Sequence, residues 1–188
     1  MNNLLRKSIK KYQEGEDLKY GVQKLSNKIR AKSKEAIALL RRNNIKESKK
    51  RIKNIEELFK LINKIVSKNE ELLNQSFYKE AVEEYIEAII YFNFLEKAET
   101  KIPKFIQTGF EEIISGICDF TGELVRRAIT IANPKNLKDL ILYQKTMENV
   151  AQELTKVGFR GKLRQKYDEV ERNLRKLQDI LYDMKFKK

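Results

Sequence analysis

The sequence predicts a single all-α domain over residues 1–188, a bundle of six to seven helices in which the first and the last are long. Three observations support this prediction. Only two prolines and seven glycines interrupt the 188 residues. Apolar residues recur at helical spacing over most of the chain, and no stretch shows the apolar-polar alternation of a half-buried strand. A chain of this length can also bury a sizeable core.

The first two helices are separated by a pair of asparagines. The first helix should run from near Leu4 to near Arg42, where Asn43 and Asn44 interrupt the pattern. Asn44 followed by Glu47 resembles a capping box that opens the second helix. The first helix should bury Val22, Leu25, Ile29, Ser33, Ala36 and Leu40. The second should bury Ile52, Ile55, Phe59, Ile62 and Val66.

Three more helices follow, with breaks marked by proline and asparagine. The third covers about residues 76–98, and Pro103 lies in the break after it. Residues 108–111, Thr-Gly-Phe-Glu, resemble a capping box with the threonine as the cap of the fourth helix. That helix should end just before Pro134. The fifth covers about residues 136–158, and its first residue, an asparagine, is predicted to cap it.

The last helix, about residues 161–184, differs from the others because its apolar residues follow a strict heptad spacing. The line consists of Leu163, Tyr167, Val170, Leu174, Leu177, Leu181 and Met184. Such a narrow seam is typical of a helix that pairs along its length. Two interpretations stay open: the seam lies on its own domain, or part of it meets another subunit.

Composition excludes several kinds of chemistry. The chain has no histidine, which removes Ser-His-Asp triads and His-Cys zinc sites. Its one cysteine, Cys118, cannot form an internal disulfide and is interpreted as a packing residue. No apolar run reaches the length of a membrane span, and the N-terminal residues are too polar for a signal peptide. We therefore expect no membrane partner and a cytoplasmic location.

The net charge of +13 is unevenly distributed along the chain. Residues 1–70 carry +12, residues 71–132 carry −5 and residues 133–188 carry +6. Basic ends around an acidic middle favour a polyanionic partner such as nucleic acid. The alternative is a lysine-rich composition spread over solvated faces. The basic residues that we select as candidates for binding nucleic acid are Arg30, Lys34, Arg41 and Arg42.

The fourth predicted helix carries an acidic line directly beside its apolar line. Its apolar residues are Ile113, Ile117, Phe120 and Leu124, and the neighbouring line is Glu112, Gly116, Asp119 and Glu123. Residues one apart on a helix are separated by about 100°, so these carboxylates should lie at the edge of the core. Carboxylates in that position need a positive partner. Gly116 and Gly122 would allow another helix to come close.

A second acidic cluster, on the third helix, consists of Glu80, Glu83, Glu84 and Glu87. Glu84 and Glu87 share a face, and like charges at this spacing repel unless a cation lies between them. Paired with Asp119 and Glu123 on a facing helix, they would form an all-oxygen site suited to Mg²⁺ or Mn²⁺. A metal-bound water could then hydrolyse a phosphodiester. The alternative is four solvated carboxylates near lysines.

Five segments of the chain resemble the translin/Trax superfamily. Residues 116–124, GICDFTGEL, look like the segment around the Asp-Leu-Thr-Gly-Glu-Leu motif of Trax. Residues 84–88, EYIEA, look like the Glu-Tyr-Val-Glu-Ala of Trax. Residues 32–42 are similar to the first long helix of the family. Residues 163–168 and 179–183 are similar to its closing helix, and there they are nearer to translin.

The resemblance implies a translin-type helical bundle that assembles into a closed octamer with a basic interior for single-stranded RNA or DNA. It also implies a metal-dependent ribonuclease in which Glu84, Glu87 and Asp119 are catalytic and Glu123 is a further metal ligand. We therefore predict a homo-octamer that uses Mg²⁺ or Mn²⁺ to cleave single-stranded RNA. The alternatives are a translin-like protein that binds RNA or DNA without cutting it, and a purely structural helical protein.

Overall fold

The structure is a computed structural model that describes residues 1–67 and 69–186. Within these residues the chain forms six α-helices and two short 3₁₀ turns, and no strand. The elements are α1 (Asn2–Arg41), α2 (Ile45–Val66), η1 (Glu70–Asn74), α3 (Ser76–Glu96), α4 (Phe110–Ile131), η2 (Pro134–Asn136), α5 (Leu137–Thr155) and α6 (Gly161–Phe186). The prediction of an all-α bundle with long first and last helices is confirmed.

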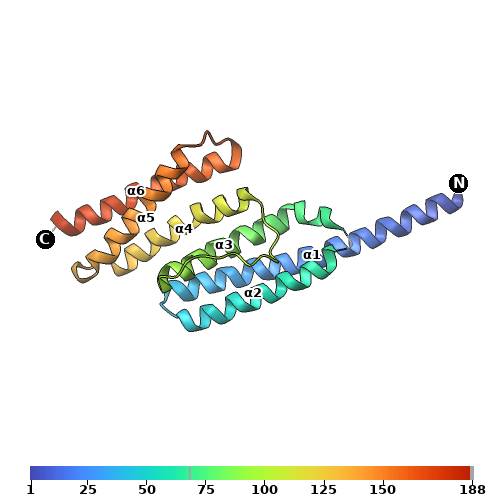
Figure 1. Ribbon diagram of the computed structural model, residues 1–188, viewed down its shortest axis with the longest axis horizontal. Coiled ribbons are helices and arrows are strands. Elements are labelled where there is room, and N and C mark those ends of the chain that lie inside the picture. The colour runs from blue at the N-terminus through green and yellow to red at the C-terminus, as the bar shows by residue number, and fades with distance from the viewer. Residues whose placement is uncertain (68, 187–188) are drawn as a thin grey trace.

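The helices form two groups that meet at the contact between α3 and α4 (Figure 1). In the first group α1 packs against α2 and α3, and in the second α6 packs against α4 and α5. The core stripe predicted for α2 is confirmed, because all five of its residues are buried. In α1, Ser26 is buried and Leu25 is only half-buried, so the line shifts by one residue there.

The contact between α3 and α4 is close at Gly116. A Cβ atom added at Gly116 would lie 2.6 Å from Cγ2 of Ile86 and 3.0 Å from the carbonyl oxygen of Glu83. The expectation that a glycine lets another helix approach is therefore confirmed at this position. It is wrong for Gly122, where an added Cβ would meet only Nδ2 of Asn173, at an ordinary 3.6 Å.

Of the three predicted helix caps, the structure shows one. The side chain of Asn44 accepts a hydrogen bond from the backbone N–H of Glu47 at 3.3 Å. Thr108 does not cap α4; instead the backbone N–H of Gly109 donates to Oε2 of Glu112 at 2.8 Å. Asn136 stands at the start of α5, but its side chain donates to the last carbonyl of α4, that of Ile131. A backbone acceptor within reach displaced the local cap.

Part of the heptad seam of α6 lies inside the subunit. Val170 and Leu177 are fully buried, and Leu181 is nearly so. They belong to apolar clusters shared with α4 and α5, on which α6 packs. The interpretation that the seam lies on its own domain is confirmed for these three residues, whereas Leu163, Tyr167, Leu174 and Met184 are half-buried, and contact of that part with another subunit stays a prediction. The spacing indicated a helix that pairs along its length, and the helices it pairs with belong to the same chain.

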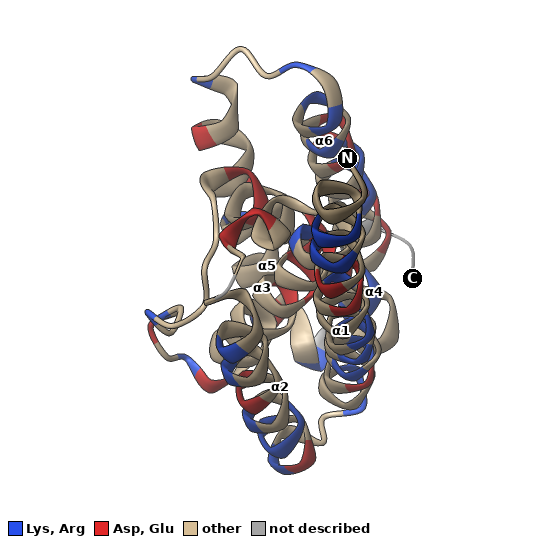
Figure 2. Cartoon of the chain, turned by 90° about the vertical axis from the view of Figure 1, so that its right-hand side faces the viewer, with Lys and Arg blue, Asp and Glu red and all other residues tan. Residues whose placement is uncertain are grey.

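The first part of α1 projects beyond the ends of α2 and α3 (Figure 1). Basic residues follow the length of α1, as Figure 2 shows when the molecule is viewed from that end. Within the described residues, no helix has both the length and the apolar character needed to cross a bilayer.

Candidate functional site

A cavity of about 610 Å³ opens between α1, α3, α4 and α6. The four predicted acidic residues line it together: Glu84, Glu87, Asp119 and Glu123. Basic side chains from three helices line it as well, namely Lys34, Arg41, Arg126 and Lys176. The sequence placed the acids on two helices, and the structure brings them to one cavity.

Helix geometry and one close contact explain this meeting of carboxylates. Glu84 and Glu87 are three residues apart on α3, and Asp119 and Glu123 are four apart on α4, so each pair shares a face. The approach of α3 to α4 at Gly116 holds the two faces together. Glu87 is 9% exposed and Glu123 is 2% exposed. The prediction that the acidic line of α4 lies at the edge of the core is confirmed for Glu123.

Three of the four acids have basic partners. Lys34 Nζ lies 3.3 Å from Glu84 Oε1, and Lys166 of α6 bonds Asp119. Glu123 has two partners, since Arg126 Nη1 lies 2.6 Å from Oε1 and Arg41 Nε lies 3.0 Å from Oε2. The contact with Arg41 is an ion pair without hydrogen-bond geometry, because Oε2 of Glu123 has no hydrogen-bond donor. One carboxylate oxygen deep in the cavity is thus left without a directed donor.

Glu87 differs from the other three acids because the described residues offer it no ion pair. Burial raises the pKa of Glu87 to about 8, and repulsion from Asp119, Glu123 and Glu84 adds to this effect. Lys166 offsets only part of it. Burial also raises the pKa of Glu123, against the opposing influence of Arg41 and Arg126. The metal-free cavity therefore keeps Glu87 protonated at neutral pH, and a bound cation would favour its ionised form.

The donors suit a hard divalent cation in type, but they are not arranged as a finished ligand group. Carboxylate oxygens are the ligands that Mg²⁺ and Mn²⁺ prefer. Among the described residues, no three acidic or cysteine side chains converge closely enough to hold a metal ion. Lys166 at Asp119 and Lys34 at Glu84 occupy the carboxylates instead. The buried Glu87, which has no ion pair among the described residues, and Oε2 of Glu123, which has no hydrogen-bond donor, are the observations that fit a cation here.

The four predicted nucleic-acid-binding residues do not all reach the cavity. Lys34 and Arg41 line it. Arg30 pairs with Glu80 at 2.8 Å, outside the lining. Arg42 is exposed just after the end of α1. The acidic cluster of α3 is divided in the same way, because Glu83 turns to Lys162 of α6.

Sequence reasoning missed the contribution of α6. Lys166, Asn173 and Lys176 reach the acidic region from this helix. Lys166 pairs with Asp119, whereas Asn173 and Lys176 line the cavity. They form a line one residue before the heptad seam, just as the acidic line of α4 lies beside its apolar line. The position of these polar residues directly beside the apolar seam was the sequence pattern that could have predicted their place at the cavity. This pattern is informative only if α6 is known to pack on α4 of its own chain.

The six-helix bundle of the described residues, with long first and last helices, has a translin-type fold. The sequence pattern of the Translin family matches residues 17–188, and the chain belongs to this family. No curated protein matches it.

Among solved structures, the crystal structure of AfC3PO is similar, with 22% identity and a TM-score of 0.85. The structure of AfC3PO with duplex RNA gives 21% and 0.83, and the crystal structure of apo-NeC3PO gives 20% and 0.84. Each alignment covers 96% of both chains. At these identities the likeness shows the fold.

Proposed function

We propose that this protein is a metal-dependent ribonuclease that binds and cleaves single-stranded RNA. The observation that carries the proposal is that four carboxylates from α3 and α4 meet in one cavity. The basic side chains of Lys34, Arg41 and Arg126, here called the basic rim, also line this cavity. Membership of the Translin family and the fold shared with AfC3PO, a protein solved with duplex RNA, support an RNA partner. The Trax-like character of the acidic segments supports cleavage.

Glu84, Glu87, Asp119 and Glu123 would hold Mg²⁺ or Mn²⁺. When bound, such an ion supplies an activated water and stabilises negative charge on the phosphate. The residues of the chain provide a poorly hydrated environment for the ion. Burial of Glu87 and Glu123 shields their carboxylates from water. Fixed, poorly hydrated donors interact with a cation more strongly than solvated ones do.

The basic rim would position the RNA. Lys34, Arg41 and Arg126 lie at the cavity, and all three have substantially exposed side chains. Each is paired with a carboxylate, and a cation bound among the acids would leave these side chains available to phosphate. Lys and Arg contacts of this kind neutralise the backbone and are independent of base sequence.

Assembly into a closed homo-oligomer, an octamer by resemblance, is part of this proposal, as is a cytoplasmic location. A closed ring would bring several basic α1 helices around one interior. Val170, Leu177 and Leu181 of the α6 seam are buried in their own chain, so they would not take part in a subunit contact, whereas the half-buried Leu163 and Tyr167 could do so.

Binding without cleavage is a second candidate function. The ion pairs of Lys34 with Glu84 and of Lys166 with Asp119 favour it, because they satisfy two of the acids without a metal. In that case the cavity would only stabilise the fold, and the exposed basic residues would hold the RNA.

The experiment that separates the two functions uses labelled single-stranded RNA with the purified protein, in Mg²⁺ and in EDTA. Cleavage in Mg²⁺ that stops in EDTA supports the ribonuclease. Asp119→Asn should then remove cleavage, whereas Asp139→Asn, at an exposed acid of α5, should keep it. Salt-sensitive binding with no cleavage under either condition establishes the second candidate. Absence of both binding and cleavage refutes both.

A further inference from the structure

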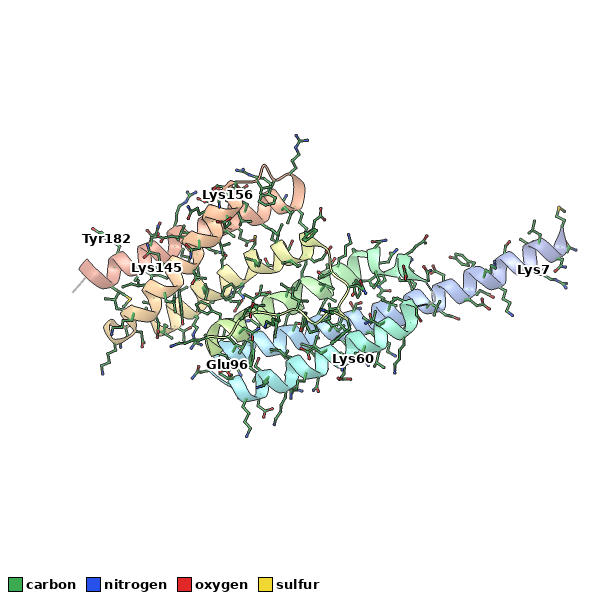
Figure 3. All side chains as sticks on the ribbon, viewed as in Figure 1. Lys7, Lys60, Glu96, Lys145, Lys156 and Tyr182 are labelled. Carbon is green, nitrogen blue, oxygen red and sulfur yellow. The ribbon has the colours of Figure 1, made fainter. Side chains whose placement is uncertain are left out.

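Residues 2–20 at the start of α1 are here called the arm, and most of them stand apart from the rest of the molecule. Residues 1–14 are all exposed, and the side chains around Lys7 project into open space (Figure 3). Packing begins at Leu18, which is partly buried against the core, and continues at Gly21, which faces Ile65 near the end of α2, and at the fully buried Val22. The exposed part of the arm is a continuous helix that projects beyond α2 and α3 (Figure 1).

One face of the arm is apolar. Leu5, Ile9 and Tyr12 follow one another at spacings of four and three residues, and all three are exposed. Continued beyond Tyr12, the same alternation of spacings leads to Glu16 and Lys19, so the exposed apolar line ends at Tyr12. Val22 and Ile29, which α1 buries in the body, lie on a different face of the helix. A bare face of this kind on a helix is typical of one that packs against another helix.

The two halves of the arm carry opposite charge. The basic half contains Arg6, Lys7, Lys10 and Lys11, and the acidic half contains Glu14, Glu16 and Asp17. Within the arm, Lys10 reaches Glu14 only at 4.0 Å and Lys19 reaches Glu16 at 3.7 Å, both on exposed surface. Exposed pairs at these distances stabilise a helix little. The change of sign falls at Tyr12, at the end of the apolar line.

We propose that the arm pairs with the arm of a second copy of this chain, antiparallel and centred on Tyr12. Antiparallel pairing sets each basic half against an acidic half, whereas parallel pairing would set like charges together. Around a twofold axis at Tyr12, Lys7 comes opposite Asp17 of the second copy and Lys10 comes opposite its Glu14. Ile9 comes opposite Gly15, which has no other atom within 4 Å of an added Cβ and so leaves room for it.

Charge also distinguishes this partner from others. An anionic membrane or an RNA strand would attract the basic half and repel the acidic half, so neither would cover the whole apolar line. A second copy complements both halves at once and forms a closed contact. The inference rests on the arm alone and does not depend on the ribonuclease proposal.

Site-specific cross-linking tests the register. In the proposed pair Tyr12 meets its own copy, so Tyr12→Cys should form a covalent dimer under mild oxidation. Tyr20→Cys is the matched control: it replaces another exposed tyrosine of the arm, but the two cysteines would stand 16 residues apart, about 24 Å along the helix. Cys118 is buried and should not contribute. Equal cross-linking of the two variants, or none for Tyr12→Cys, would overturn the proposal.

Charge reversal in the Tyr12→Cys background tests the electrostatic argument. Changing Arg6, Lys7, Lys10 and Lys11 to Glu makes both halves of the arm net acidic, and changing Glu14, Glu16 and Asp17 to Lys makes the arm basic throughout. Each variant alone should cross-link about tenfold more slowly. An equal mixture should recover the rate by joining an acidic arm to a basic one. Unchanged rates would overturn the proposal, even with a native circular dichroism spectrum.

The same variants distinguish the other partners. If the basic arm gains affinity for single-stranded RNA or for phosphatidylserine vesicles, and its mixture with the acidic arm recovers no cross-linking, then the arm is a polyanion-binding or membrane-binding element. That result would overturn arm-to-arm pairing. Arm-to-arm pairing would be supported if the mixture recovers the rate of cross-linking and if the variant that carries Tyr12→Cys alone also cross-links.

Discussion

Replacing Gly116 by alanine tests whether the approach of α3 to α4 assembles both the core and the acidic cavity. An alanine Cβ would lie 2.6 Å and 2.8 Å from two side-chain atoms of Ile86 and 3.0 Å from the carbonyl oxygen of Glu83. Carbon atoms in favourable contact are separated by about 3.5–4.0 Å. Ile86 is fully buried and the other contact is with backbone, so neither can turn aside. The two helices must separate by roughly 1 Å.

The expected cost follows from two opposing effects. Overpacking of a well-packed core costs about 1–3 kcal/mol, and the size of this overlap favours the upper end. Alanine is a better helix former than glycine by about 1 kcal/mol. The net loss for Gly116→Ala is then about 2 kcal/mol, which corresponds to a fall of about 4–8 °C in Tm for a chain of this size.

Gly122→Ala is the matched control, since it lies on the same helix and its added Cβ meets only an amide nitrogen at 3.6 Å. It should gain up to about 1 kcal/mol from helix propensity. Urea unfolding followed by circular dichroism measures the free energy of unfolding of both variants. Both should be measured at the same protein concentration, because the apparent stability of an oligomer depends on concentration. If Gly116→Ala were as stable as Gly122→Ala, the close contact would not hold α3 against α4, and the account of the cavity would fail with it.

Four further predictions concern the site and the core. Asp119→Asn should abolish Mg²⁺-dependent cleavage while RNA binding changes less than about tenfold, because one negative charge is lost in a nearly isosteric change; wild-type turnover would contradict the assignment. The logarithm of RNA affinity should fall linearly with the logarithm of salt concentration, and Lys34→Ala should make the slope shallower by about 1; a flat dependence would refute the role of the rim. Burial raises the pKa of Glu87 to about 8, so the folded chain keeps a proton that the unfolded chain loses above about 4.3. The stability of the metal-free protein should therefore fall as the pH rises from about 4.5 to about 8, and urea titrations in EDTA should show a shallower fall for Glu87→Gln. Leu177→Glu places a charge at a fully buried position and should lower helicity as well as mass, whereas loss of mass alone, seen by light scattering, would return the seam to the subunit interface.

Periodicity was sufficient to predict the stripes of single helices. The buried line of α2 and the shared faces of Glu84 with Glu87 and of Asp119 with Glu123 follow from 3.6 residues per turn. The resemblance then predicted that these two faces belong to one site. Gly116 gave a physical reason for the same meeting, because a glycine in a helix is a cost that close packing can explain.

Partners across helices could not be predicted in the same way. The heptad line of α6 indicates that this helix pairs, but spacing alone does not tell whether the facing helix belongs to the same chain or to another. The ion pair of Lys166 with Asp119 depends on that choice, and the pair of Arg41 with Glu123 likewise joins two helices far apart in sequence. Asn136 failed as a cap for a related reason: the end of α4 presented a carbonyl that no local pattern reveals.

The depth at which each charge lies bears on whether one cavity can serve a cation and a polyanion together. The carboxylates of Glu87 and Glu123 lie deep, whereas the side chains of Lys34 and Arg126 are each 62% exposed. If the acidic and basic side chains lay at the same depth, their charges would cancel, and the cavity would attract neither a cation nor RNA. With the acids below and the bases above, a divalent cation entering the deep part would meet negative charge in a poorly hydrated place, where Coulomb attraction is strong. Binding of this cation would weaken the ion pairs between the carboxylates and the basic side chains of the rim, which could then bind phosphate.

RNA and metal should therefore bind with positive coupling, and by linkage each must raise the affinity of the protein for the other. Titration of Mn²⁺ with and without a non-cleavable single-stranded oligonucleotide measures this coupling, and equal Mn²⁺ affinities in the two titrations would refute the layered arrangement as the source of function.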